Sequence, residues 1–119
     1  MSWKDLLERG REIILATSSK NGRPNAVVVI CEGIIDDKIL INVCQMKTSL
    51  NNIKENNQVC VVTTGNGEYY RISGNAILHS SGKYFDIGIK SNDETYPVKH
   101  VLTIDAKHVF DLDKAKVIL

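Results

Sequence analysis

The sequence has no long hydrophobic run, no cluster of basic residues and no excess of charge of either sign. No apolar stretch in the 119 residues approaches the ~20 that a membrane-spanning helix requires, so we expect no membrane segment. A net charge of +1 without a basic, aromatic-rich face argues against a nucleic-acid-binding module. Residues 1–10 contain no apolar signal core, which predicts a cytoplasmic protein.

Cysteine and histidine are also scarce, and neither residue type shows metal-ligand spacing. The three cysteines include no Cys-x-x-Cys pair, which predicts reduced thiols that act as small apolar residues. The three histidines form no metal-ligand spacing with one another or with the cysteines, so we predict no metal site. The residues are Cys31, Cys44, Cys60, His79, His100 and His108.

What the chain does contain is enough apolar sequence for one globular domain over residues 1–119. Hydrophobic residues make up 43% and charged residues 24%, a composition that excludes disorder. Apolar, β-branched runs predict strands at residues 13–18, 26–31, 38–43, 59–64, 68–78, 98–104 and 108–112. Helical spacing of apolar residues predicts short helices at residues 3–10, 50–57 and 83–90.

Six or seven antiparallel strands in so short a chain favour a closed architecture. A single open sheet of that size leaves two edges with unpaired backbone groups, whereas a barrel removes them. We therefore predict a mainly β protein, a small antiparallel β-barrel with short helices.

Several turns have recognisable signals. Asn21-Gly22 predicts a hairpin with a type I′ turn, because both residue types tolerate positive φ. Residues 105–107 read as the turn between the last two strands. Gly74 inside a long strand predicts a bulge or a close backbone approach. The adjacent Tyr69 and Tyr70 are expected to point to opposite faces of that strand.

The most informative stretch is residues 38–57, a strand followed by a tight turn and a short amphipathic helix. The turn, residues 44–49, ends in Lys47, Thr48 and Ser49, and either hydroxyl can cap the helix. Free N–H groups at a helix start, with a lysine and two hydroxyls beside them, suit a phosphate group. The alternative is an ordinary capped helix that binds nothing.

The strand at residues 26–31 is apolar on both faces, which requires a cover on each side. The barrel core supplies one cover. The second is a helix, a bound ligand or a partner subunit.

Together these elements resemble the FMN-binding split-barrel family, which includes relatives of pyridoxamine phosphate oxidase and small bacterial FMN-binding proteins. The likeness spans roughly residues 3–112 and rests on the order and spacing of four segments. They are residues 14–18 with Arg23-Pro24-Asn25-Ala26-Val27, residues 38–43 with Met46-Lys47-Thr48 and Asn52-Ile53, residues 57–62, and residues 70–76.

The resemblance implies FMN as the cofactor, with its phosphate at Lys47 and Thr48 and no adjacent arginine. It also implies that the ribityl chain and ring lie against two neighbouring segments of the chain. The implied cofactor-binding residues are Asn25, Ala26, Val27, Val28, Val43, Cys44, Gln45, Met46, Lys47 and Thr48. Members of the family are homodimers with the flavin near the interface, which implies the same assembly here.

The resemblance favours a redox flavoprotein, either a small oxidoreductase or an electron carrier, since the flavin carries the electrons. The sequence identifies no catalytic side chain and neither the electron donor nor the acceptor, which would be a small molecule or a protein. A deazaflavin or haem in the same groove is one alternative, with a histidine needed to ligate haem. A non-enzymatic dimeric barrel without cofactor is the other.

Overall fold

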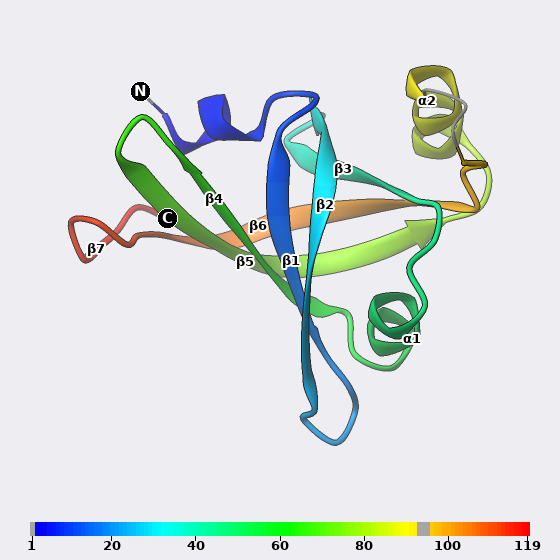
Figure 1. Cartoon of the computed structure of the whole chain (residues 1–119), viewed down its shortest axis with the longest axis horizontal. Helices are drawn as coiled ribbons and strands as arrows, with labels where there is room; N and C mark the ends of the chain where they lie inside the picture. The colour runs from blue at the N-terminus through cyan, green and yellow to red at the C-terminus, as the bar shows by residue number, and fades with distance from the viewer. Residues whose placement is uncertain (1, 93–95) are drawn as a thin grey trace.

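The computed structural model describes residues 2–92 and 96–119 and shows a closed antiparallel β-barrel (Figure 1). The hydrogen-bonded strand order is β3-β2-β1-β4-β5-β6-β7, and pairing of β3 with β6 closes the first six strands on themselves. The strands are β1 (Glu12–Ser18), β2 (Pro24–Ile35), β3 (Lys38–Val43), β4 (Gln58–Gly65), β5 (Glu68–His79), β6 (His100–Asp111) and β7 (Lys116–Val117). The predicted mainly β barrel is confirmed.

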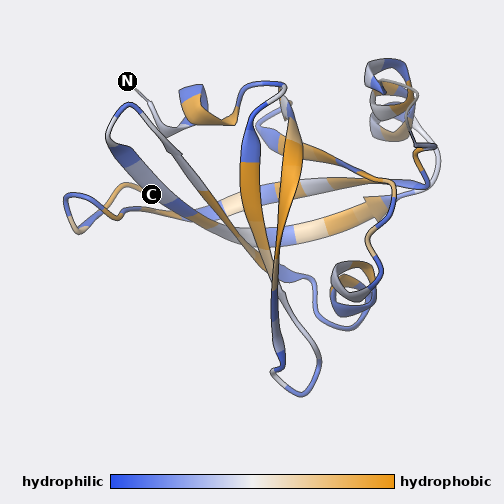
Figure 2. Cartoon of the chain, in the orientation of Figure 1, coloured by the Kyte–Doolittle hydropathy of each residue, from blue (hydrophilic) through white to orange (hydrophobic). Residues whose placement is uncertain are grey.

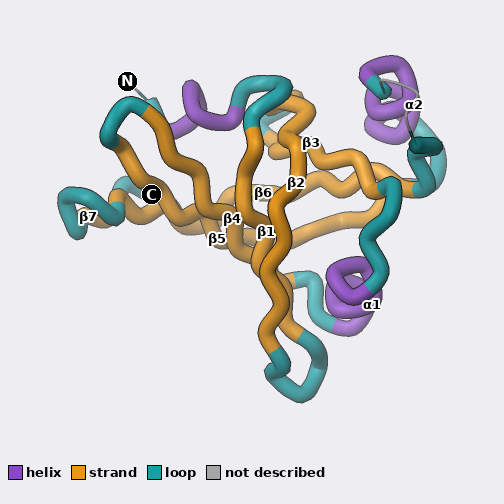
Figure 3. The backbone as a smooth tube through the Cα atoms, viewed as in Figure 1, coloured by secondary structure: helices purple, strands orange, loops and turns teal. Residues whose placement is uncertain are grey.

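Two α-helices lie outside the barrel wall, and a 3-10 helix covers one end (Figure 3). They are η1 (Trp3–Leu7), α1 (Thr48–Glu55) and α2 (Lys83–Ser91). Leu6 and Leu7 of η1 are completely buried in the core cluster, and the Leu6 carbonyl accepts a 2.6 Å hydrogen bond from the Thr63 hydroxyl of β4. This helix therefore plugs the barrel. No helix in the described ranges is long and apolar enough to cross a membrane.

The core forms from alternate residues of the strands, as period-2 patterning requires. On β1, Ile13 and Leu15 are buried while Ile14 between them is 42% exposed. On β5, Tyr70 is buried and Tyr69 is 47% exposed, which confirms that the two tyrosines face opposite ways. Each barrel strand thus has an inner and an outer face.

The β1–β2 hairpin is present at the predicted place, but its turn is not type I′. Ser18 pairs with Pro24, which leaves a five-residue loop instead of the two residues that a type I′ turn has. Only Gly22 has positive φ, and its N–H donates to the Ser19 carbonyl at 2.9 Å. Successive positive φ values occur instead at Asp36 and Asp37, between β2 and β3.

The predicted turn at residues 105–107 is wrong. These residues lie within the continuous strand β6, which pairs with β5 along its length. The register shifts there, because Ser73 pairs with His108 and Gly74 pairs with Ala106, leaving Lys107 as the extra residue of a β-bulge. A polar run resembling a turn is therefore a bulge, and the predicted bulge at Gly74 is confirmed.

The predicted side-chain cap of α1 is also wrong. Lys47 is the N-cap residue and makes no side-chain cap hydrogen bond, whereas Thr48 is already helical. The Ser49 hydroxyl accepts a hydrogen bond from the Asn25 side chain on β2 instead. A tertiary contact thus replaces the local cap.

The other helices follow the prediction with shifted ends. At the N-terminus, η1 ends at Leu7, sooner than the predicted residue 10, and α2 ends at Ser91, one residue later than predicted. The predicted loop at residues 91–97 lies partly outside the described residues.

Candidate groove between the diverging strands

The barrel has an opening where β2 and β3 separate. β3 pairs with β2 only through residues 31–35, whereas its full length pairs with β6. In the described structure, residues 24–30 of β2 therefore pair with β1 alone. Because the backbone groups of an antiparallel strand point alternately to its two edges, alternate N–H and C=O groups of this segment face the open side.

A groove of about 650 Å³ lies along this open edge. One wall is apolar and consists of four successive residues of β2 with Met46 from the segment after β3. The lining residues are Arg9, Gly10, Val27, Val28, Val29, Ile30, Glu32, Asn42, Cys44, Gln45, Met46, Ser91, Asn92 and Tyr96. A groove of this size with apolar walls and a few polar groups is typical of a cofactor site.

The opposite wall comes from segments that lie far from β2 and β3 along the sequence and that were not predicted to be part of the site. Arg9 follows η1, and its guanidinium donates to the Ser91 carbonyl at the end of α2, at 2.9 Å. The same side chain lies 3.7 Å from the Glu32 carboxylate of β2. Arg9 thus joins three distant segments at the rim of the groove. No local sequence signal indicates contacts between residues so far apart in the chain.

A smaller pocket of about 370 Å³ lies at the start of α1, lined by Arg23, Pro24, Asn25, Thr48 and Asn52. We call this the helix-start pocket. The first intrahelical bond runs from the Asn51 N–H to the Lys47 carbonyl, so the N–H groups before Asn51 have no partner within the helix. The guanidinium of Arg23 adds a positive charge. These groups suit an anion.

Two side-chain hydrogen bonds hold α1 against the barrel beside this pocket. Asn25 Nδ2 donates to Ser49 Oγ at 2.9 Å, and Asn52 Nδ2 donates to Thr17 Oγ1 at 3.1 Å. Ser49, Asn52 and Thr17 are all buried. The start of the helix is therefore fixed relative to β1 and β2.

The groove and the helix-start pocket follow one another along both segments of the chain. Asn25 precedes Val27 on β2, and Thr48 follows Met46 after β3, so the residues that line the pocket are close in sequence to residues that line the groove. Most of the predicted residues line one or the other. In the groove these are Val27, Val28, Cys44, Gln45 and Met46, and in the pocket they are Asn25 and Thr48.

Three predicted residues line neither cavity. Val43 is buried in the core, and its carbonyl already accepts the Lys99 N–H at 2.9 Å. Ala26 is exposed on the outer face of β2, and Lys47 is exposed at the N-cap of α1. Arg23, which was not among the predicted residues, lines the pocket beside Thr48.

None of the three histidines lines the groove. His79 shares a 2.8 Å hydrogen bond with the Thr103 hydroxyl, and His108 lies on the outer face of β6. His100 is half-buried, and its Nδ1 has no partner among the described residues. The groove therefore offers no histidine as a haem ligand.

Solved structures share this fold. HupZ of Group A Streptococcus matches with a TM-score of 0.85 and 21% identity, over 98% of this chain and 95% of that one. An FMN-binding protein of Syntrophomonas wolfei matches with a TM-score of 0.75 and 22% identity, over 92% and 87%. HutZ, a haem storage protein of Vibrio cholerae, matches with a TM-score of 0.68 and 12% identity, over 91% and 90%. Identities this low establish the fold alone.

The barrel that opens between two strands is a split barrel, and the sequence places it in a family. The chain belongs to the pyridoxamine 5'-phosphate oxidase family, whose model matches residues 2–117. No curated protein matches the sequence.

Proposed function

We propose that this protein binds FMN in the groove and the helix-start pocket and acts as a small redox flavoprotein. The observation that carries this proposal is that the two cavities follow one another along β2 and along the segment after β3. One has an apolar wall, and the other has helix N–H groups without an intrahelical partner beside Arg23. FMN has the matching shape, with a flat ring at one end and a phosphate at the other.

The residues present fit this cofactor. Val27, Val29 and Met46 offer apolar contact for the ring, and the open edge of β2 offers backbone groups for its polar rim. Thr48 and Arg23 offer a hydroxyl and a bidentate donor to the phosphate. When bound, the flavin supplies the electron transfer, while the chain binds and orients it. Arg9 and Ser91, at the end of α2, would flank the bound cofactor on one side.

Haem is the weaker candidate. The Vibrio cholerae relative is named a haem storage protein, but no histidine of this chain lines the groove. A deazaflavin fits the same cavities as FMN and stays the closest alternative. Visible absorbance of the purified protein separates the three cofactors.

The direct test begins with protein purified without added cofactor, its spectrum recorded before and after addition of FMN and desalting. We expect a retained flavin spectrum and a higher melting temperature, since ligand at ~100 times its Kd adds ~2.7 kcal/mol of stability. If the protein is colourless and FMN does not change its melting temperature, the proposal is overturned. A deazaflavin-binding protein or a barrel without a cofactor would then be left.

Variants then locate the phosphate. Arg23→Ala and Thr48→Ala should each weaken FMN about tenfold, which corresponds to the loss of one charge-assisted hydrogen bond. Lys47→Ala should weaken it less, because Lys47 lies beside the pocket without lining it. Lys54→Ala, at the exposed far end of α1, is the matched control. Riboflavin lacks the phosphate, so its affinity should not change in Arg23→Ala.

We further propose that the protein is a homodimer formed through the outer face of β1 and β2. Ile14, Val28 and Ile30 are 42%, 63% and 48% exposed there, on paired strands whose apolar stretch is visible in Figure 2. Val28 and Ile30 also line the groove, so a second copy on this face would lie beside the cofactor. The segment 26–31 of β2 was expected to need a cover on each face. The second subunit would then cover its outer face, while the barrel core covers its inner face.

Light scattering tests the dimer. Ile14→Lys should convert it to monomer, because the lysine would be buried in the interface, and Ile14 does not line the groove. Ile77→Lys on β5 is the control. Ile77 is 48% exposed, similar to Ile14, and lies away from the proposed interface, so this variant should stay dimeric. A wild-type monomer at micromolar concentration would contradict this assembly.

A further inference from the structure

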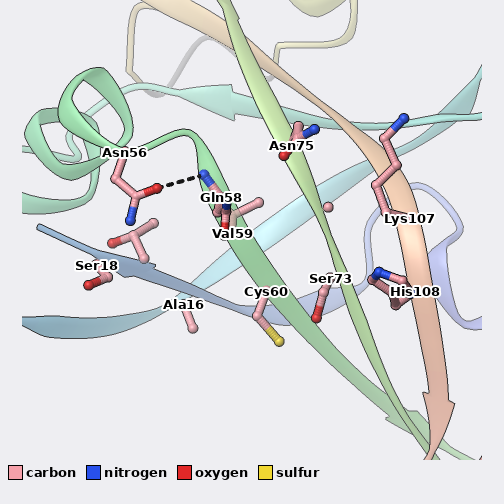
Figure 4. A pocket seen from close by; sticks show the side chains of 12 residues that line it. Ala16, Ser18, Asn56, Gln58, Val59, Cys60, Ser73, Asn75, Lys107 and His108 are labelled. Carbon is pink, nitrogen blue, oxygen red and sulfur yellow. Dashed lines mark hydrogen bonds between the residues drawn. The ribbon is translucent and has the colours of Figure 1, made fainter. Parts of the chain in front are cut away.

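A third cavity of about 520 Å³ lies at the bulge between β5 and β6 (Figure 4). We call it the bulge pocket. It shares no residue with the groove or the helix-start pocket, and its walls come from β1, the connection after α1, and strands β4, β5 and β6. Its lining is therefore distinct from that of the proposed flavin site, and the hydrogen bond from Asn52 to Thr17 joins the two pockets.

The bulge directs two basic residues toward the same cavity. Lys107 is the extra residue between the pairs Ser73–His108 and Gly74–Ala106, and both Lys107 and His108 line the pocket. A regular strand would send consecutive side chains to opposite faces, whereas a bulge re-aims one of them. Gly74 permits this geometry, because a Cβ there would overlap the Asp105 carbonyl. The pocket thus depends on a specific local distortion.

Among the residues that the structure describes, the lining is rich in hydrogen-bond donors and includes no carboxylate. The side chains of Gln58, Asn75, Lys107 and His108 make no hydrogen bond or ion pair with any described residue. Figure 4 shows them on three adjacent strands, and the hydrogen bond that it marks runs from the Gln58 N–H to Asn56 Oδ1. These donors are therefore free for a ligand.

One acidic residue close to the bulge pocket already has a cationic partner. Asp105, two residues before Lys107, forms an ion pair with Lys38 of β3 at 2.5 Å. Lys107 is a cation and the described lining includes no carboxylate, so the bulge pocket favours an anion over a cation.

We propose that the bulge pocket binds a small oxyanion, a phosphate or carboxylate group, through Lys107 and His108 and the side-chain amides of Gln58 and Asn75. Lysine supplies a point charge, while the amides and the imidazole supply N–H donors to separate oxygens. This ligand is separate from the phosphate of the flavin.

Backbone-amide NMR titration of the full chain tests the site, with sodium phosphate and sodium acetate in separate arms at constant ionic strength. We expect saturable shifts at the amides of Ser73, Gly74 and Lys107. The double variant Lys107→Ala/His108→Gln should bind at least tenfold more weakly and still retain FMN. Lys114→Ala, an exposed lysine in the turn before β7, is the matched control.

The helix-start pocket also suits phosphate, so Arg23→Ala separates the two sites. In that variant the shifts at the bulge pocket should persist unchanged. Saturation by phosphate alone or by acetate alone supports the site and identifies which group it prefers. Absence of saturation by both anions, or equal binding by the double variant, overturns the proposal, whatever happens to FMN.

Discussion

Asn25 Nδ2 donates a 2.9 Å hydrogen bond to Ser49 Oγ, joining strand β2 to the first turn of α1 across 24 residues of sequence. Ser49 is 2% exposed, so its hydroxyl has little access to solvent. This contact sets the width of the helix-start pocket, because Asn25 lines one side and Thr48, the neighbour of Ser49, lines the other.

Asn25→Ala should therefore affect both stability and ligand affinity. It removes the donor and leaves the buried Ser49 hydroxyl without this partner, which costs about 1–2 kcal/mol of unfolding free energy. Urea unfolding measures this loss, and FMN titration should show weaker binding. Asn51→Ala, on the exposed side of α1, is the control and should change neither. Wild-type stability for Asn25→Ala would show that the contact contributes nothing.

Gly74→Ala tests the bulge. The new methyl group would overlap the Asp105 backbone, so the β5–β6 pairing must shift, at a cost of about 3 kcal/mol. The comparison is Gly22→Ala in the β1–β2 loop, where the space is open and positive φ alone costs about 1 kcal/mol. Thermal or urea unfolding should rank the two in that order. The reverse order would contradict the close approach at Gly74.

Cys31 should be inert in the folded protein. Burial raises the pKa of its thiol to about 11, and its Sγ lies 3.2 Å from the Leu7 carbonyl. At pH 8 only about one molecule in a thousand then holds the reactive thiolate there. Alkylation with iodoacetamide followed by peptide mass analysis should leave Cys31 unmodified in native protein and modified in urea. Equal labelling in both states would exclude this burial.

Asp36 should make stability depend on pH in the acid range. Hydrogen bonds from Lys83 at 2.6 Å and from the Tyr84 hydroxyl at 2.9 Å lower the pKa of its carboxyl group. A lowered folded-state pKa stabilises the protein above the unfolded pKa of about 4, and the gain disappears as pH falls through the lower folded value.

Asp36→Asn should accordingly lower the melting temperature at pH 7 and have a shrinking effect as pH falls below about 4. Asparagine tolerates the positive φ of 54° at this position, so the substitution changes charge without straining the turn. Melting curves at several pH values measure the difference. A constant difference across that range would exclude the ionic contribution.

Much of the fold is determined by local sequence. Alternating apolar residues set the inner and outer faces of β1 and β5, and the number of strands in a short chain favours closure. The family resemblance implied Val27, Val28, Cys44, Gln45, Met46 and Thr48, and these residues line the groove or the helix-start pocket. These residues come from β2 and from the segment after β3, and β2 and β3 are joined by the short turn at residues 36–37, so they lie close in sequence as well as in space.

Tertiary structure decided the rest, because the remaining parts depend on contacts between distant residues. Arg9 and Ser91 meet across 82 residues, and Arg23 reaches the start of α1 only through the β1–β2 loop. Pairing with β5 likewise converts residues 105–107 from an apparent turn into a bulge, since register between strands is a property of both partners.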